Sequence, residues 1–270
     1  MQNYYKGLLG EQATVRRQIA PHVMSMGNYL SIEHQLALCA PFSEKDIKTA
    51  MFLIPNTKSP GSDGFSSGFF KATWHITVGL VKEAIQHFFC IDKLPAYLGE
   101  TKLVLLPKVP NPKQAREFRP ISCCNVLYKC VAKLLSMSLK AVLAHLIHQN
   151  QEAFIKDREL LLNILTCQDI VRGHNRKGLS QRCIMKIDLQ KAFDSVHWQF
   201  LKELIDHLRF PSQFLAWILE CITSVTYRVH VNGQAGAIFK GGRGMKRGGP
   251  LSPLLFVLSM EYFTRLMMTT

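Results

Sequence analysis

The chain has 270 residues, of which 47% are hydrophobic, so it can bury a sizeable core in one large domain or two small ones and is not a disordered tail. Lys and Arg total 33 against 19 Asp and Glu, and the formal net charge of +14 indicates an anionic partner such as nucleic acid or a membrane surface. No apolar run is long enough to span a bilayer and the N-terminus lacks the order of a signal peptide, so we expect nucleic acid rather than membrane as the partner. We also expect an intracellular location, nuclear or cytoplasmic, and not secretion.

Cysteine and histidine do not form a pattern typical of a metal site. The eight cysteines are scattered with no Cys-x-x-Cys pair, which predicts buried thiols in a reducing compartment. His145 and His148 form a His-x-x-His pair on a predicted helix, but no further ligands of zinc type stand at a matching spacing. We therefore expect a pair of surface or core histidines.

The N-terminal part of the chain is predicted to be helical. Residues 1–41 show helical apolar spacing and are expected to form a connector. Ser43, with Asp46 three residues later, is typical of a capped helix start. A loop rich in turn-forming residues occupies 58–64, and residues 74–89 then restore a helical period.

A strand, a basic loop and a helix follow in that order. Residues 101–107 are predicted to be a strand, and 108–119 a basic loop that returns through 118–122. The apolar spacing over 126–148 predicts a helix with lysines outside its apolar stripe.

The second half of the chain mixes both kinds of element. Four further helices are predicted, at residues 160–172, 198–208, 212–223 and 251–268. A polar loop at 174–181 leads to a short strand at 183–188, Asn232-Gly233 predicts the turn of a hairpin, and a glycine-rich basic loop spans 241–250. Because these elements follow no regular β-α-β repeat, we expect an α+β fold.

Asp188 is the first candidate for chemistry. It closes the predicted strand at 183–188, and a carboxylate held on a rigid element suits a hard cation such as Mg²⁺. The alternative is an aspartate that only caps the following turn. Phosphoryl transfer to a growing strand uses two divalent ions roughly 4 Å apart, held by two or three carboxylates. Asp194 is a second carboxylate or, alternatively, the cap of the helix that begins near His197.

Basic residues gather in two loops. The first group surrounds the predicted strand and its loop, and its members are Lys102, Lys108, Lys113, Arg116 and Arg119. Such cations suit a triphosphate or a nucleic-acid backbone, and the alternative is a solvated basic loop. Arg119 stands between Phe118 and Pro120 in a rigid frame and is therefore the strongest candidate. The second group lies among the glycines of 241–250, where the backbone can approach a ligand closely.

Six segments follow one another along the chain: Lys58-Ser-Pro-Gly-Ser-Asp-Gly-Phe, Leu106-Pro-Lys, Phe118-Arg-Pro-Ile-Ser, Gln151-x-x-Phe-Ile-x-x-Arg158, Ile187-Asp-Leu-Gln-Lys-Ala-Phe-Asp194 and Pro250-Leu-Ser-Pro-Leu-Leu-Phe256. In this order they resemble the reverse transcriptases of non-LTR (LINE-type) retrotransposons, of the kind found in plants. The resemblance covers residues 42–268.

This resemblance implies a right-hand polymerase fold. Its parts would be the N-terminal helical connector at 1–41, fingers at 42–160 and a partial palm at 161–270. The implied partners are an RNA template, a DNA primer and deoxynucleoside triphosphates, and the implied cofactor is Mg²⁺.

The resemblance also implies roles for individual residues. Asp188 matches the first metal-binding, catalytic aspartate. Phe193 matches the aromatic residue under the incoming sugar, which selects deoxynucleotides by clashing with a ribose 2′-hydroxyl. Lys108 and Arg119 match the cations that neutralise the triphosphate, and Gly248 belongs to the loop that supports template and nucleotide.

The chain departs from the family pattern at four points. Arg247 and Gly249 stand where the family typically has Gln and Asp, and Ser62 replaces the usual Pro. The family's Tyr-x-Asp-Asp turn, which bears the other metal-binding aspartates, does not occur in these residues and is expected soon after residue 270. We therefore expect a polymerase fragment that lacks activity alone, and the alternative is an inactive remnant that at most binds nucleic acid non-specifically.

Overall fold

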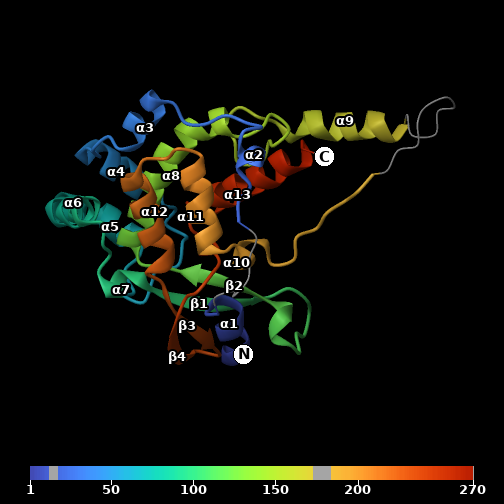
Figure 1. The fold of residues 1–270 in the computed structure, drawn as a ribbon. Coiled ribbons are helices and arrows are strands. Elements are labelled where there is room, and N and C mark those ends of the chain that lie inside the picture. The colour runs from blue at the N-terminus through green and yellow to red at the C-terminus, as the bar shows by residue number, and fades with distance from the viewer. Residues whose placement is uncertain (12–17, 173–183, 270) are drawn as a thin grey trace, which may run out of the picture.

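The computed structural model describes residues 1–11, 18–172 and 184–269 and has the expected mixture of helices and one small sheet (Figure 1). The helices are α1 (Gln2–Leu9), α2 (Pro21–Met24), α3 (Ile32–Leu38), α4 (Glu44–Phe52), α5 (Ser67–Ala72), α6 (Trp74–Ile91), α7 (Ala96–Gly99), α8 (Val126–Leu146), α9 (Leu160–Arg172), α10 (Ala192–Ser195), α11 (Trp198–His207), α12 (Ser212–Thr223) and α13 (Ser252–Met267). Within the described ranges, none of these helices is long and apolar enough to cross a membrane.

One four-stranded mixed sheet joins two distant hairpins. Its strands are β1 (Glu100–Pro107), β2 (Phe118–Cys123), β3 (Thr226–Val231) and β4 (Gln234–Lys240), in the order β2-β1-β3-β4. Each hairpin is antiparallel, and β1 pairs with β3 in parallel. Asn232 and Gly233 both have positive φ, 50° and 79°, which confirms the predicted two-residue turn.

Helix α1 covers one face of this sheet. Tyr5 and Leu9 are buried there in a small apolar cluster with side chains of β1, β3 and β4 and of the residue before β3, namely Leu103, Tyr227, Val229, Phe239 and Val225. The opposite face carries the basic side chains Lys102, Arg228 and Arg119 together with apolar ones such as Leu106, because Lys102 pairs with Arg228 and Leu106 with Arg119. The sheet therefore has an apolar face, covered by α1, and a basic face.

Helix α8 forms the centre of the larger core. Buried side chains lie on all sides of it, and it contacts α3, α4, α6, α7, α12 and α13 (Figure 1). A buried ion pair within α13, Arg265 Nε to Glu261 Oε1 at 2.8 Å, orients the two side chains that attach this helix to its surroundings, and Glu261 Oε2 accepts from the His148 N–H (2.9 Å). The Arg265 guanidinium also donates to the carbonyls of Met24, Asn28 and Leu146, so each of its polar groups is used.

Most predicted elements are present. The Ser43 hydroxyl accepts from the Asp46 N–H and the Asp46 carboxylate accepts from the Ser43 N–H, which confirms the predicted capping box. The last helix begins at Ser252, with Pro253 in its first turn. The predicted polar loop at 174–181 lies outside the described residues.

The predicted strand at 183–188 is wrong. Residues 184–189 are irregular and exposed, and Cys183 lies outside the described ranges. A strand needs a neighbour for its N–H and C=O groups, and no described strand pairs with this segment. The alternation of side chains along residues 183–188 is therefore not enough to predict a strand.

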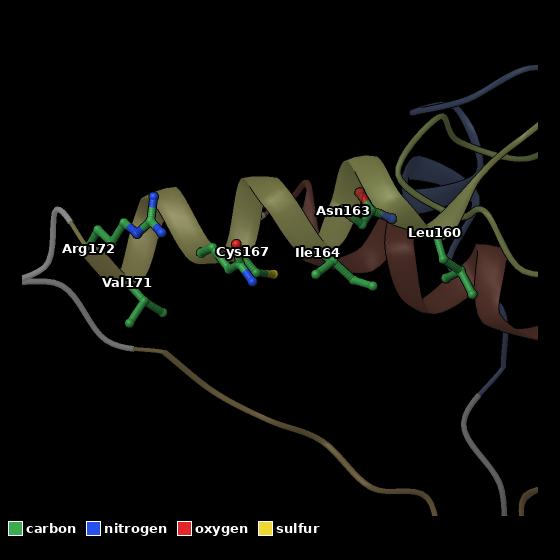
Figure 2. Close-up of a pocket in the computed structure, with 7 residues that line it drawn as sticks. Leu160, Asn163, Ile164, Cys167, Val171 and Arg172 are labelled. Atoms are coloured by element: carbon green, nitrogen blue, oxygen red, sulfur yellow. The ribbon is translucent and has the colours of Figure 1, made fainter.

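Helix α9 projects from the body, and residues 184–189 return from its far end as an extended segment (Figure 1). None of its side chains is buried. Figure 2 shows Leu160, Ile164 and Val171 pointing to one side of α9. Ile184 and Ile187 are more than half exposed as well, so an uncovered apolar surface lies on both segments.

Candidate nucleotide-binding site

The basic loop between β1 and β2 is ordered by hydrogen bonds. The Lys108 N–H donates to the Glu117 carbonyl (2.8 Å), and Lys108 Nζ donates to the Arg116 carbonyl (2.8 Å). The Glu117 carboxylate accepts from the N–H groups of Gln114 (3.0 Å) and Lys113 (2.6 Å), and these hydrogen bonds lower the pKa of Glu117. Lys108 is thus exposed on a loop with a defined shape.

Arg119 lies on the basic face of the sheet. It pairs in register with Leu106, and both side chains are exposed. Pro120, next to it, is buried. The guanidinium therefore extends into solvent from a strand that is fixed on its other side.

The glycine-rich loop is held between α10 and β2. The Gly244 N–H donates to the Val196 carbonyl (2.8 Å), the Met245 N–H to the Phe193 carbonyl (2.9 Å), and the Ser122 N–H of β2 to the Arg247 carbonyl (3.0 Å).

Two glycines permit this arrangement. Gly244 has φ 80°, and a Cβ there would lie 2.9 Å from the Asp194 carbonyl oxygen. Gly248 has φ 98° and lies beside Ile121 of β2. The backbone of this loop is therefore set by close approach to α10 at Gly244, whereas at Gly248 its positive φ favours glycine and β2 lies at ordinary contact distance.

Asp194 and Arg247 form an ion pair within this junction. Arg247 Nη2 lies 3.1 Å from Asp194 Oδ2, and the Asp194 side chain is 4% exposed. Burial raises the pKa of Asp194, whereas Arg247, Lys191 and Lys108 lower it. The structure places Asp194 in α10, while His197 is the N-cap of α11, so the interpretation of Asp194 as that cap is wrong. Arg247, which departs from the family pattern, is the residue that pairs with it.

Phe193 connects α10 to the last helix. Its half-buried ring packs against Phe256 of α13, with centroids 5.0 Å apart and planes 31° apart. Because the Phe193 carbonyl also accepts a hydrogen bond from the Met245 N–H, Phe193 is fixed relative to the glycine-rich loop.

Lys246 is buried, contrary to its prediction as a loop cation. It is 3% exposed, and its Nζ has no hydrogen-bond partner among the described residues. The ammonium lies 3.5 Å from the centroid of the Tyr128 ring, and burial lowers the pKa of Lys246. This lysine is therefore not available to an anion in solution.

Helix α1 braces both loops. The Tyr5 hydroxyl donates to the Ala115 carbonyl of the basic loop (2.9 Å), and burial raises the pKa of Tyr5 to about 12. The Arg243 guanidinium donates to the carbonyls of Leu8 (2.7 Å) and Gly7 (3.1 Å) at the C-terminal end of α1. The segment predicted as a connector thus contacts the candidate site directly.

The described structure links four of the five candidates through the glycine-rich loop and its neighbours. Phe193 binds this loop, Gly248 belongs to it, and β2, which carries Arg119, contacts it at Ile121 and Ser122. The charge of Lys108 lowers the pKa of Asp194 at the same junction. Asp188 stands apart on the exposed segment 184–189.

Comparisons with known proteins identify the family of the chain. The family described as reverse transcriptase (RNA-dependent DNA polymerase) matches residues 109–270. The chain belongs to this family.

The chain is similar to transposon and retrotransposon proteins. It is 32% identical, over 83% of its length, to 17% of the "Transposon TX1 uncharacterized 149 kDa protein" of Xenopus laevis. It is 25% identical, over 88% of its length, to 22% of the "Retrovirus-related Pol polyprotein from type-2 retrotransposable element R2DM" of Drosophila melanogaster. An R2 Pol polyprotein of Nasonia vitripennis is 24% identical over 84% of the chain. The chain spans about a fifth of the length of these relatives. The prediction of a reverse transcriptase segment of a non-LTR retrotransposon is confirmed, and the inactive remnant is not favoured.

The metal expected for this reverse transcriptase does not fit the described residues on their own. They contain no group of three or more His, Cys, Asp or Glu side chains placed to hold an ion. Asp194, the carboxylate nearest in sequence to Asp188, is engaged with Arg247. The present side chains therefore supply one candidate ligand, Asp188, and not a complete site.

The cysteines that the structure describes are free thiols, and both histidines of the His-x-x-His pair contact backbone groups. Of the cysteines that the structure describes, all are free; four are buried, and Cys90 and Cys167 are exposed. His145 Nε2 lies 3.0 Å from the Tyr29 carbonyl, and His148 Nδ1 accepts from the Asn150 N–H. Sequence inspection missed the roles of Arg247 and Tyr5, whose partners are distant in the chain.

Proposed function

We propose that this chain forms the fingers and part of the palm of an RNA-directed DNA polymerase, which adds deoxynucleotides to a primer 3′-end on an RNA template. The observation that carries the proposal is the junction of three segments. The glycine-rich loop, bound to both α10 and β2, lies between Phe193 and the strand that bears Arg119.

Each candidate residue has a role in this proposal. Lys108 and Arg119 neutralise the triphosphate, since both cations extend from an ordered loop and strand. Phe193 lies under the incoming sugar, and a ring fixed by Phe256 resists displacement by a 2′-hydroxyl. Gly248 allows the loop backbone to approach the nucleotide, because a side chain at φ 98° is strained.

The proposed division is a connector at 1–41, fingers at 42–160 and a partial palm at 161–270 of a right-hand polymerase. The sheet includes strands from both of the larger parts, and α1 packs on it. The three parts are therefore expected to unfold together rather than as independent units.

Asp188 is proposed to bind Mg²⁺ as one ligand among several. The family's Tyr-x-Asp-Asp turn would supply the further carboxylates. The uncovered apolar surface on residues 184–189 and on α9 supports such a neighbour, since exposed apolar area is normally covered by a partner.

A primer-extension assay tests the proposal. The purified chain is given a poly(rA) template, an oligo(dT) primer, dTTP and Mg²⁺, and the Asp188→Asn variant is compared with the matched variant Asp169→Asn on α9. Because the described residues supply one candidate metal ligand, we expect the chain alone to bind template and primer without extending the primer. Extension that is lost with Asp188→Asn and kept with Asp169→Asn would show that this one ligand suffices, whereas failure of the unchanged protein to bind template and primer would contradict the proposal.

A further inference from the structure

A cavity of about 420 Å³, with both polar and apolar surface in its lining, lies at the start of β1, on the basic face of the sheet. Because strands rise about 3.3 Å per residue, Lys102 is roughly 20 Å along β1 from Lys108. The cavity is therefore separate from the proposed triphosphate position. Its lining includes side chains of β1 and β3 and part of the loop at 58–64, to which sequence inspection assigned turn geometry but no role.

Asn125 builds one wall of the cavity. It is fully buried, and its Nδ2 donates to the Tyr97 carbonyl (3.0 Å). The Ser62 hydroxyl is 3.5 Å from Asn125 Oδ1, and a Cβ at Gly61 would lie only 1.9 Å from the same oxygen. Glycine is thus required where the loop touches Asn125. The loop, Tyr97 and α8 are held together by one amide, so the cavity has a fixed shape.

Cations and aromatic rings share this cavity. Lys102 and Arg228 are neighbours in the parallel pairing of β1 with β3, and Arg228 Nε lies 3.2 Å from Glu100 Oε1. Burial, with the charges of Lys102 and Arg228, lowers the pKa of His230, while Glu100 opposes this. The neutral ring of His230 and the Tyr97 side chain, 63% exposed, both line the space.

This mixture selects one class of ligand. A triphosphate is disfavoured, because Glu100 and Asp63 add two acidic groups to the lining. One phosphate beside Lys102, with a base against an aromatic ring and its polar edge near Asp63, matches what is present. The volume falls within the usual range for small-ligand sites, roughly 300–1,000 Å³.

We propose that this cavity binds one unpaired nucleotide of the single-stranded template, with its phosphate at Lys102 and its base stacked on Tyr97. The inference rests on the proposed function, because it takes its ligand from the RNA that the polymerase copies.

The test measures binding of fluorescent single-stranded oligo(rU) to the full chain by anisotropy over a range of salt. Tyr97→Ala is expected to weaken binding about ten-fold, since stacking of a base on an aromatic ring contributes on this scale, whereas Tyr97→Phe keeps the ring and the affinity. Lys102→Gln is expected to reduce the salt slope by about 0.7, the value for one phosphate contact on a single strand. Lys156→Gln, at a side chain that is 83% exposed and remote in sequence, is the matched control and should leave the slope unchanged.

Two results would overturn the inference in different ways. If Tyr97→Ala and Lys102→Gln bind oligo(rU) like the unchanged protein, the cavity is not a template site and the proposed function is unaffected. If the unchanged protein binds neither oligo(rU) nor a primer–template duplex, the proposed function fails and the inference fails with it. Thermal unfolding of each variant confirms that a loss of binding is not a loss of fold.

Discussion

Replacement of Lys246 by methionine should stabilise the protein. The lysine is 3% exposed, and its ammonium has no hydrogen-bond partner among the described residues. Burial of an ion costs several kcal/mol even after relaxation. The cation–π interaction with Tyr128, whose ring centroid is 3.5 Å from Lys246 Nζ, offsets about 2 kcal/mol of this cost. Methionine has a similar length and no charge, so Lys246→Met is expected to raise the free energy of unfolding by about 1–3 kcal/mol at pH 7.

The stabilisation expected from Lys246→Met should depend on pH. Because the pKa of Lys246 is lowered in the folded state, the unfolded state binds more protons between the folded and the unfolded pKa. The penalty is therefore complete below the folded pKa and disappears as pH rises toward about 10.4. The difference in stability between Lys246→Met and the unchanged protein should shrink over that window.

Urea unfolding at a series of pH values measures this difference. Lys156→Met, at an exposed position, is the control and should change stability by no more than about 0.5 kcal/mol. A loss of more than about 1 kcal/mol in Lys246→Met at pH 7 would refute the reasoning, because it would mean that the ammonium has a stabilising partner.

Three further substitutions probe the junction and the exposed helix. Arg247→Gln restores the family's residue and leaves the buried Asp194 charge poorly compensated, so it should lower the free energy of unfolding by about 2 kcal/mol. A double-mutant cycle with Asp194→Asn checks this, because additive effects of the two substitutions would contradict the ion pair. Tyr5→Phe removes one hydrogen bond and should lower the free energy of unfolding by about 1 kcal/mol. It should also speed amide exchange in residues 108–119, whereas the control Tyr4→Phe should not, and equal exchange in both variants would argue against bracing by α1. Ile164→Lys on α9 should change stability by no more than about 0.5 kcal/mol, and a loss of 2 kcal/mol or more would show that this face is already covered.

Elements set by local interactions were predictable from the sequence. The capping box at Ser43 and the hairpin turn at Asn232 depend on neighbours within a few residues, and both are present. Helix α8 was equally clear, because its apolar spacing repeats over 21 residues.

Features that depend on distant partners were not predictable. The strand at 183–188 failed because a strand requires a paired neighbour as well as alternation. Asp194 and Arg247 are 53 residues apart, and only the close approach allowed by Gly244 brings their segments together. Lys246 stands in a basic, glycine-rich run, and nothing local indicates that the Tyr128 ring covers it.

The central claim is that Lys108, Arg119, Phe193 and Gly248 surround one incoming deoxynucleotide. Photo-cross-linking of 4-thio-dTTP to the chain on a poly(rA) template with an oligo(dT) primer, followed by mass spectrometry, tests it without requiring catalysis. We predict cross-links within residues 108–122, 192–196 or 241–250 that need the matching template and are out-competed by dTTP but not by UTP. Cross-links confined to other segments, or unchanged when poly(rC) replaces poly(rA), would contradict the claim.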